Sequence, residues 1–193
     1  YFPEQRNISL NTNVTVSNMV VPPQNVDPAT GKERFVQEGT SLVYAHPKQR
    51  LKAIASGNNK LPKLLATTGT VTHPNYDETD SKGDTAIRDH TYGAVVVEII
   101  DEKFYNLRHI HAQQDGKFID MGKKFEGNKK PTDAIVEALI LGDVHMGDQD
   151  EKTMAANYEM IDFFKPKRLF LHDFINAHSV NPHEKDNLIT RIR

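Results

Sequence analysis

The feature that most constrains this chain lies at residues 139–147, where an apolar run ends in Gly-Asp-Val-His-Met-Gly. Residues 139–141 are Leu-Ile-Leu, which is typical of a buried strand, and the glycines around the Asp-x-His triplet indicate a loop. The strand would deliver the Asp143 carboxylate and the His145 imidazole, two residues apart, to that loop. These two groups suit a metal ion better than a protein core, so the pattern predicts a metal site.

A second strand of the same kind is expected at residues 168–171, Arg-Leu-Phe-Leu, which His172 and Asp173 follow. Between the two strands, apolar side chains recur at spacings of four, three and three, which predicts an amphipathic helix over residues 151–164. Pro166 would end this helix. The helix side chains that form the apolar stripe are Met154, Tyr158, Ile161 and Phe164.

Strand, helix and strand in this order predict a βαβ unit with two parallel strands. The carboxyl ends of parallel strands meet at one edge of the sheet, where ligands bind in open α/β folds. We therefore expect Asp143 and Asp173 to lie close together. Two carboxylates at close range repel each other unless a cation lies between them, which again favours a metal.

The composition limits the chemistry of such a site. The chain of 193 residues contains no cysteine, so its metal ligands must be His, Asp, Glu or Asn. Its formal net charge is −2, which neither favours nor excludes a nucleic acid as partner. No apolar run approaches the roughly 20 residues needed to cross a bilayer, so no membrane partner is expected.

Residues 1–130 have the pattern of a strand-rich region. Residues 8–16 alternate between apolar and polar side chains, residues 64–71 form another candidate strand, and residues 93–100 are a β-branched run expected to be buried. Asp115-Gly116 between two apolar stretches predicts a hairpin. The polar residues 79–84 indicate a mobile loop, and the basic residues 123–130 indicate a linker. Five lysines, at positions 117, 123, 124, 129 and 130, form either a phosphate-binding patch or a solvated face.

The Gly142–His145 sequence resembles the first motif, Asp-x-His, of the calcineurin-like metallophosphoesterase superfamily, and the resemblance covers roughly residues 133–193. It implies that Asp143 and His145 bind a first metal and that Asp173, in the place of the second motif, bridges two metals. His172 stands where the family has glycine. We therefore expect an α/β metallophosphoesterase-type βαβ core at residues 131–193, apparently truncated, with its third motif beyond residue 193.

The resemblance also implies a cofactor and a reaction. The cofactor would be two divalent ions, Mn²⁺ first, with Zn²⁺, Fe²⁺ or Mg²⁺ as alternatives, and the reaction would be two-metal hydrolysis of a phosphoester. In many members a histidine of the third motif protonates the leaving oxygen. The nearest candidates here are His178 and His183, in a polar segment after Asp173.

Three functions remain open from the sequence. The first is a phosphodiesterase acting on DNA, because the long N-terminal region favours a macromolecular substrate. The chain also looks similar to early, host-DNA-degrading proteins of tailed bacteriophages, which would place it in the bacterial cytoplasm. The alternatives are a phosphomonoesterase acting on phosphoproteins or nucleotides, and a non-catalytic scaffold on a degenerate phosphoesterase fold.

Overall fold

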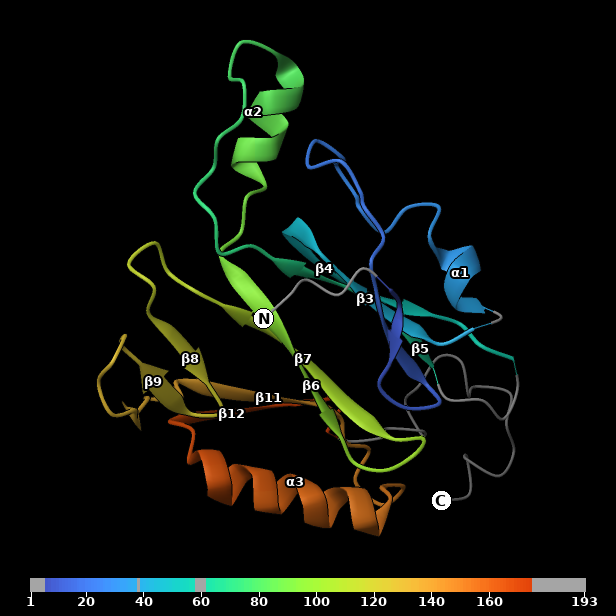
Figure 1. Cartoon of the computed structure of the whole chain (residues 1–193). Coiled ribbons are helices and arrows are strands. Elements are labelled where there is room, and N and C mark those ends of the chain that lie inside the picture. The colour runs from blue at the N-terminus through green and yellow to red at the C-terminus, as the bar shows by residue number, and fades with distance from the viewer. Residues whose placement is uncertain (1–5, 38, 58–61, 175–193) are drawn as a thin grey trace, which may run out of the picture. The chain divides into compact units, whose positions relative to one another are not determined.

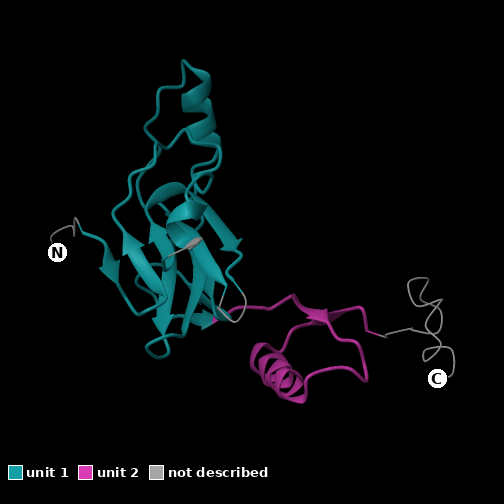
Figure 2. Ribbon diagram, turned by 90° about the vertical axis from the view of Figure 1, so that its right-hand side faces the viewer, with its two compact units in different colours: residues 1–132 teal, residues 133–193 magenta. Residues whose placement is uncertain are grey.

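Strands dominate the computed structural model, which describes residues 6–37, 39–57 and 62–174 (Figure 1). The chain divides by its internal contacts into unit 1, residues 1–132, and unit 2, residues 133–193 (Figure 2). Each unit has its own architecture, with several small sheets in unit 1 and one βαβ motif in unit 2.

The largest sheet of unit 1 has five strands in the order β1-β2-β3-β5-β4. Its middle strands run parallel to one another, and β1 and β4 pair antiparallel at the two edges. β5 confirms the strand expected at residues 64–71. The strands are β1 (Ile8–Ser9), β2 (Val14–Ser17), β3 (Ser41–Tyr44), β4 (His46–Ile54) and β5 (Lys63–Gly69).

The core of unit 1 lies on both faces of β3, whose four residues are all buried. Leu42 and Tyr44 pack in one cluster with Val36 of α1 (Glu33–Gln37), and Val43 packs in a second cluster with Ala66. Successive side chains of a strand point to opposite faces, so one strand can serve both clusters. Fully burying each of these apolar side chains contributes about 1.5–3 kcal/mol, which explains why so short a strand can anchor the sheet.

The single strand expected at residues 8–16 is wrong, because the chain turns back within this range. β1 and β2 pair antiparallel, with Ile8 opposite Val16. The turn is held by the side chain of Asn11, whose Oδ1 accepts hydrogen bonds from the backbone N–H of Asn13 and of Val14. A local side-chain bond of this kind competes with the extended conformation that the alternating pattern favours.

β6 (Gly93–Ile99) and β7 (Tyr105–His111) form a separate antiparallel pair. The expected strand is confirmed, but its expected burial is wrong, since β6 is half-buried or exposed along its length. Only alternate side chains such as Val95 and Val97 pack on the core. The β-branched sequence of this segment therefore predicted its extended conformation correctly and its burial incorrectly.

The hairpin expected at Asp115-Gly116 is confirmed, because the N–H of Gln113 bonds to the carbonyl of Lys117 and Ala112 bridges antiparallel to Phe118. The linker expected at residues 123–130 is wrong at its start. There β9 (Lys123–Phe125) pairs with β8 (Phe118–Asp120). Met121 and Gly122 both have positive φ, 46° and 72°, as a tight two-residue hairpin turn requires. The sheet order is β10-β9-β8, and β10 is Thr132–Asp133.

The mobile loop expected at residues 79–84 is also wrong, because this segment starts the helix α2 (Ser81–Arg88). The Asp80 side chain caps the helix by accepting hydrogen bonds from the N–H groups of Lys82 and Gly83. A Cβ on Gly83 would lie 1.5 Å from the carbonyl oxygen of Asp77, so the helix and the preceding turn touch through this glycine. The polar composition reflected a capped, exposed helix.

Unit 2 contains the expected βαβ motif. β11 (Ala138–Asp143) and β12 (Arg168–His172) pair in parallel, and α3 (Glu151–Phe164) connects them. The helix ends as predicted, with Lys165 in the left-handed conformation before Pro166. The expectation that the second strand is buried is wrong within the described residues, where every residue of β12 is exposed. On α3, Tyr158 is 60% exposed, so it lies outside the half-buried side of the helix.

Candidate metal centre

The candidate site begins with an irregularity in the β11–β12 ladder. Ile140 pairs with Phe170, but the next pair is Asp143 with His172, so three steps on β11 correspond to two on β12. Such a β-bulge inserts one extra residue and re-aims the side chains that follow it. Its effect is to bring Asp143 level with His172 at the end of β12.

The loops after both strands stay tied to each other by backbone hydrogen bonds. The N–H groups of Val144, His145 and Met146 donate to the carbonyls of residues 172, 173 and 174, over 3.0–3.1 Å. His145 and Asp173 both have positive φ, 45° and 40°, a region that non-glycine residues seldom adopt. These two turns and the bonds between them hold the polar side chains beyond the strand ends.

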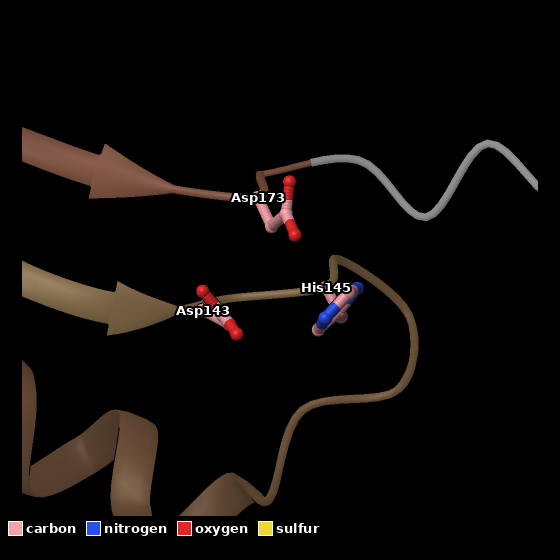
Figure 3. A group of neighbouring side chains, drawn as sticks. All are labelled: Asp143, His145 and Asp173. Atoms are coloured by element: carbon pink, nitrogen blue, oxygen red, sulfur yellow. The ribbon is translucent and has the colours of Figure 1, made fainter.

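The three residues that the sequence predicted as metal ligands meet at this point. Figure 3 shows Asp143 at the end of β11 and His145 on the loop that follows, with Asp173 opposite them after β12. One ligand atom from each of the three side chains lies within 4.8 Å of the others. His172 adds an imidazole, whose Nδ1 lies 3.7 Å from Oδ1 of Asp143. The expected meeting of Asp143 and Asp173 therefore occurs in the structure.

The donor set fits a divalent ion by its chemistry. Two carboxylates and one imidazole are the ligands that Mn²⁺, Fe²⁺, Zn²⁺ and Mg²⁺ accept in proteins. The Nδ1 atom of His145 is buried and has no hydrogen-bond partner among the described residues. Leaving a buried polar atom unsatisfied costs about 1–3 kcal/mol, so this ring is available for a ligand that the described residues do not supply.

A pocket of about 370 Å³ adjoins the carboxylate-imidazole group, between the loop after β11 and the start of α3. Its wall includes Gln149 and Asn157, which the sequence analysis missed. Asn157 lies one helical turn after Thr153, and this spacing from the start of α3 could have identified Asn157 from the sequence. Both side chains carry amides that can bind a phosphoryl or sugar oxygen.

Asp150 also lines the pocket, but its carboxylate has a structural role. It caps α3 by accepting hydrogen bonds from the N–H and the hydroxyl of Thr153, 2.8 Å each. The bond from the Thr153 backbone, then that from its hydroxyl, lowers the pKa of Asp150. Asp150 is therefore the N-cap of α3.

The two proposed proton donors, His178 and His183, lie outside the described residues. Three of the lysines in the patch form ion pairs in the structure. Lys124 and Lys129 both pair with Glu126, and Lys117 pairs with Asp115. These pairs favour the solvated-face interpretation over phosphate binding. Among the helices that the structure describes, none has the length and apolar character required to cross a membrane.

Comparison with known proteins gives one relationship to report. The chain is similar to Protein A1 of Escherichia phage T5, with 27% identity over 152 residues. The match covers 75% of this chain but 27% of the relative, so the chain spans about a quarter of that protein's length. No protein-family model and no solved structure matches the chain.

Proposed function

We propose that this chain contributes half of the site of a two-metal phosphodiesterase that acts on DNA. The observation that carries the proposal is the meeting of Asp143, His145 and Asp173 within 4.8 Å at the carboxyl ends of two parallel strands. Asp143 and His145 would hold the first ion, and Asp173 would lie between the first ion and a second one. The preferred candidate for the metal is Mn²⁺, with Zn²⁺, Fe²⁺ and Mg²⁺ as alternatives.

The residues of the site have separate tasks in this proposal. When bound, the ions supply a water molecule of lowered pKa and neutralise negative charge on the phosphoryl oxygens. His172 places an imidazole beside the Asp143 carboxylate, with Nδ1 3.7 Å from Oδ1. The amides of Gln149 and Asn157 would bind oxygens of the substrate in the adjoining pocket. His178 or His183 would protonate the leaving oxygen.

DNA is proposed as the substrate because unit 1 contributes 132 residues that a small phosphoester would not require. The likeness to a phage protein supports a role in an infected bacterium and, with it, a cytoplasmic location. The described residues supply ligands for one ion, so we expect the 193-residue chain to bind one ion and to have weak activity or none.

The first test is Mn²⁺ binding, measured by titration calorimetry on the whole chain. Asp143→Ala should abolish binding. Gly142→Ala is the matched control, because a Cβ there meets no atom within 4 Å, and it should bind as the parent does. Undiminished Mn²⁺ binding by Asp143→Ala would refute the site.

The second test compares substrates for a protein extended beyond residue 193. Linear DNA and a generic aryl phosphate are each incubated with Mn²⁺. DNA cleavage that is lost in Asp143→Ala supports the nuclease. Aryl phosphate cleavage with intact DNA identifies a phosphomonoesterase, and metal binding with neither reaction identifies a scaffold.

A further inference from the structure

A second pocket, of about 410 Å³, lies within unit 1, and none of the residues of the candidate metal centre lines it. Three chain segments line it: residues 70–73, residues 92–94, and residues 110–118 from the end of β7 into β8. The lining combines the aromatic rings of His73, Tyr92 and Phe118 with aliphatic side chains. Among the described residues that line it, none is Asp, Glu, Lys or Arg, so the pocket suits an uncharged ring system.

One aromatic wall of the pocket is fixed in place before any ligand binds. The ring of Tyr92 contacts His90 edge-on at 5.1 Å and His73 at 6.5 Å. His90 is itself held at both nitrogens. Its Nδ1 accepts a hydrogen bond from the Tyr76 hydroxyl at 3.0 Å, and its Nε2 donates to the carbonyl of Thr72 at 2.9 Å. A wall ordered in this way loses little entropy on binding.

The other walls are equally constrained. Phe118 stacks on Phe125 of the neighbouring strand, with ring centroids 4.6 Å apart and planes 8° apart. At Gly93, a Cβ would lie 2.3 Å from Nε2 of Gln49 and 2.4 Å from the carbonyl oxygen of Ile110. The same Gln49 amide donates to that carbonyl over 2.7 Å. These parts of the wall are therefore preformed.

Two side-chain amides are among the polar groups of the pocket. Gln113 and Gln114 belong to the turn between β7 and β8, where the N–H of Gly116 donates to the carbonyl of Gln113 over 2.9 Å. A side-chain amide offers two donors and one acceptor oxygen. Such a group can match the mixed donors and acceptors on the edge of a heterocycle, while the aromatic rings stack on its face.

We propose that this pocket binds the base of a nucleotide, with its sugar and phosphate left outside in solvent. A volume of about 410 Å³ lies in the range of small-molecule sites. The absence of cations from the described lining agrees with a phosphate that stays outside. The choice of a nucleobase among planar heterocycles rests on the proposed function, and the base belongs either to a free nucleotide or to a single strand.

The test is a titration of the whole 193-residue chain, labelled with ¹⁵N and free of metal, followed by NMR. The ligands are the four deoxynucleoside monophosphates, a short single-stranded oligonucleotide, and deoxyribose 5-phosphate as the control without a base. We expect saturable shifts at the backbone amides of Gly93, Ala112 and Gln113 with at least one nucleotide, and none there with the sugar phosphate. Shifts with mononucleotides alone identify a free nucleotide as the source, and shifts with the oligonucleotide as well identify a strand.

Variants then locate the binding. Tyr92→Leu removes a stacking wall and should weaken binding roughly tenfold, since stacking contributes about 1–3 kcal/mol per base. Tyr158→Leu is the matched control, because Tyr158 is an exposed tyrosine of α3 and does not line the pocket. Gln114→Leu, at an exposed turn position, tests the amide without disturbing the fold.

Two results overturn the inference. One is that no nucleotide at about 10 mM, ten times a Kd of about 1 mM, shifts these amides. The other is that the sugar phosphate shifts them equally. Failure of nucleotide binding can be distinguished from failure of the metal site. Tyr92→Leu should keep the Mn²⁺ binding of the parent chain, and Asp143→Ala should keep nucleotide binding.

Discussion

Asp173→Asn should make the protein more stable without metal and less stable with it. The substitution removes one of two negative charges whose oxygens lie within 4.8 Å of each other. At that distance two unit charges repel by about 0.9 kcal/mol in bulk water. Bulk water is the appropriate limit because both carboxylates are exposed, Asp143 by 60%. Asparagine also tolerates the positive φ of 40° at this position, so the backbone should not oppose the change.

The assay is thermal unfolding of the parent and the variant in EDTA and in Mn²⁺. In EDTA the variant should gain about 1 kcal/mol, or roughly 2–4 °C in Tm for a chain of this size. In Mn²⁺ at about 100 times its Kd, the parent should gain about 2.7 kcal/mol that the variant lacks. The order of the two Tm values should therefore reverse on adding metal.

Asp162→Asn is the matched control, since it makes the same charge change at an exposed position of α3. It should change neither the Tm in EDTA nor the response to Mn²⁺ by more than about 0.5 kcal/mol. If Asp173→Asn lowers Tm in EDTA and keeps the full Mn²⁺ response, then neither the repulsion nor the metal site exists as described.

Other predictions concern unit 1. Gly83→Ala should destabilise α2, measured as faster hydrogen exchange of its amides, whereas Gly142→Ala should leave exchange in unit 2 unchanged. Burial raises the pKa of Tyr44 to about 12, so its neutral form stabilises the fold fully below pH 10 and this contribution is lost as pH rises towards 12. Tyrosine absorbance titrated alongside unfolding would show the raised pKa of Tyr44, and titration of every tyrosine near pH 10 would contradict it. The hydrogen bonds from Arg108 lower the pKa of Asp120, so their stabilisation is present above about pH 4 and is lost as pH falls further. Arg108→Gln should remove this acid sensitivity.

The sequence predicted the elements of unit 2 well because their signals are local. The apolar spacing of α3 and the proline after it determine a helix whatever surrounds it, and the observed bounds, Glu151–Phe164, agree with the prediction. In unit 1 the failures have local causes that periodicity does not register. The side chain of Asn11 turns a regular alternation into a hairpin, and the Asp80 cap turns a polar segment into a helix.

For the candidate site, the sequence predicted which residues meet but not how. The motif and its parallel partner strand were enough to bring Asp143 and Asp173 to one edge. The bulge before Asp143 was not predictable, because it depends on the register between strands that are about 30 residues apart. The approach of His172 to Asp143 follows from that bulge. Burial was the least predictable property, since β12 has an apolar sequence yet is exposed in the described part of the chain.

The backbone at the candidate site adds to the argument that the residue types make for a ligand. His145 and Asp173 each adopt a left-handed conformation that costs a non-glycine residue about 1–2 kcal/mol, and the hydrogen bond from the N–H of His145 to the carbonyl of Asp173 joins the two. A turn that served only to connect elements would be more stable with glycine at these positions. The chain instead places an imidazole and a carboxylate there, beside a second carboxylate that repels the first. Each of these features lowers the stability of the free protein, and the divalent cation that we propose would account for them together.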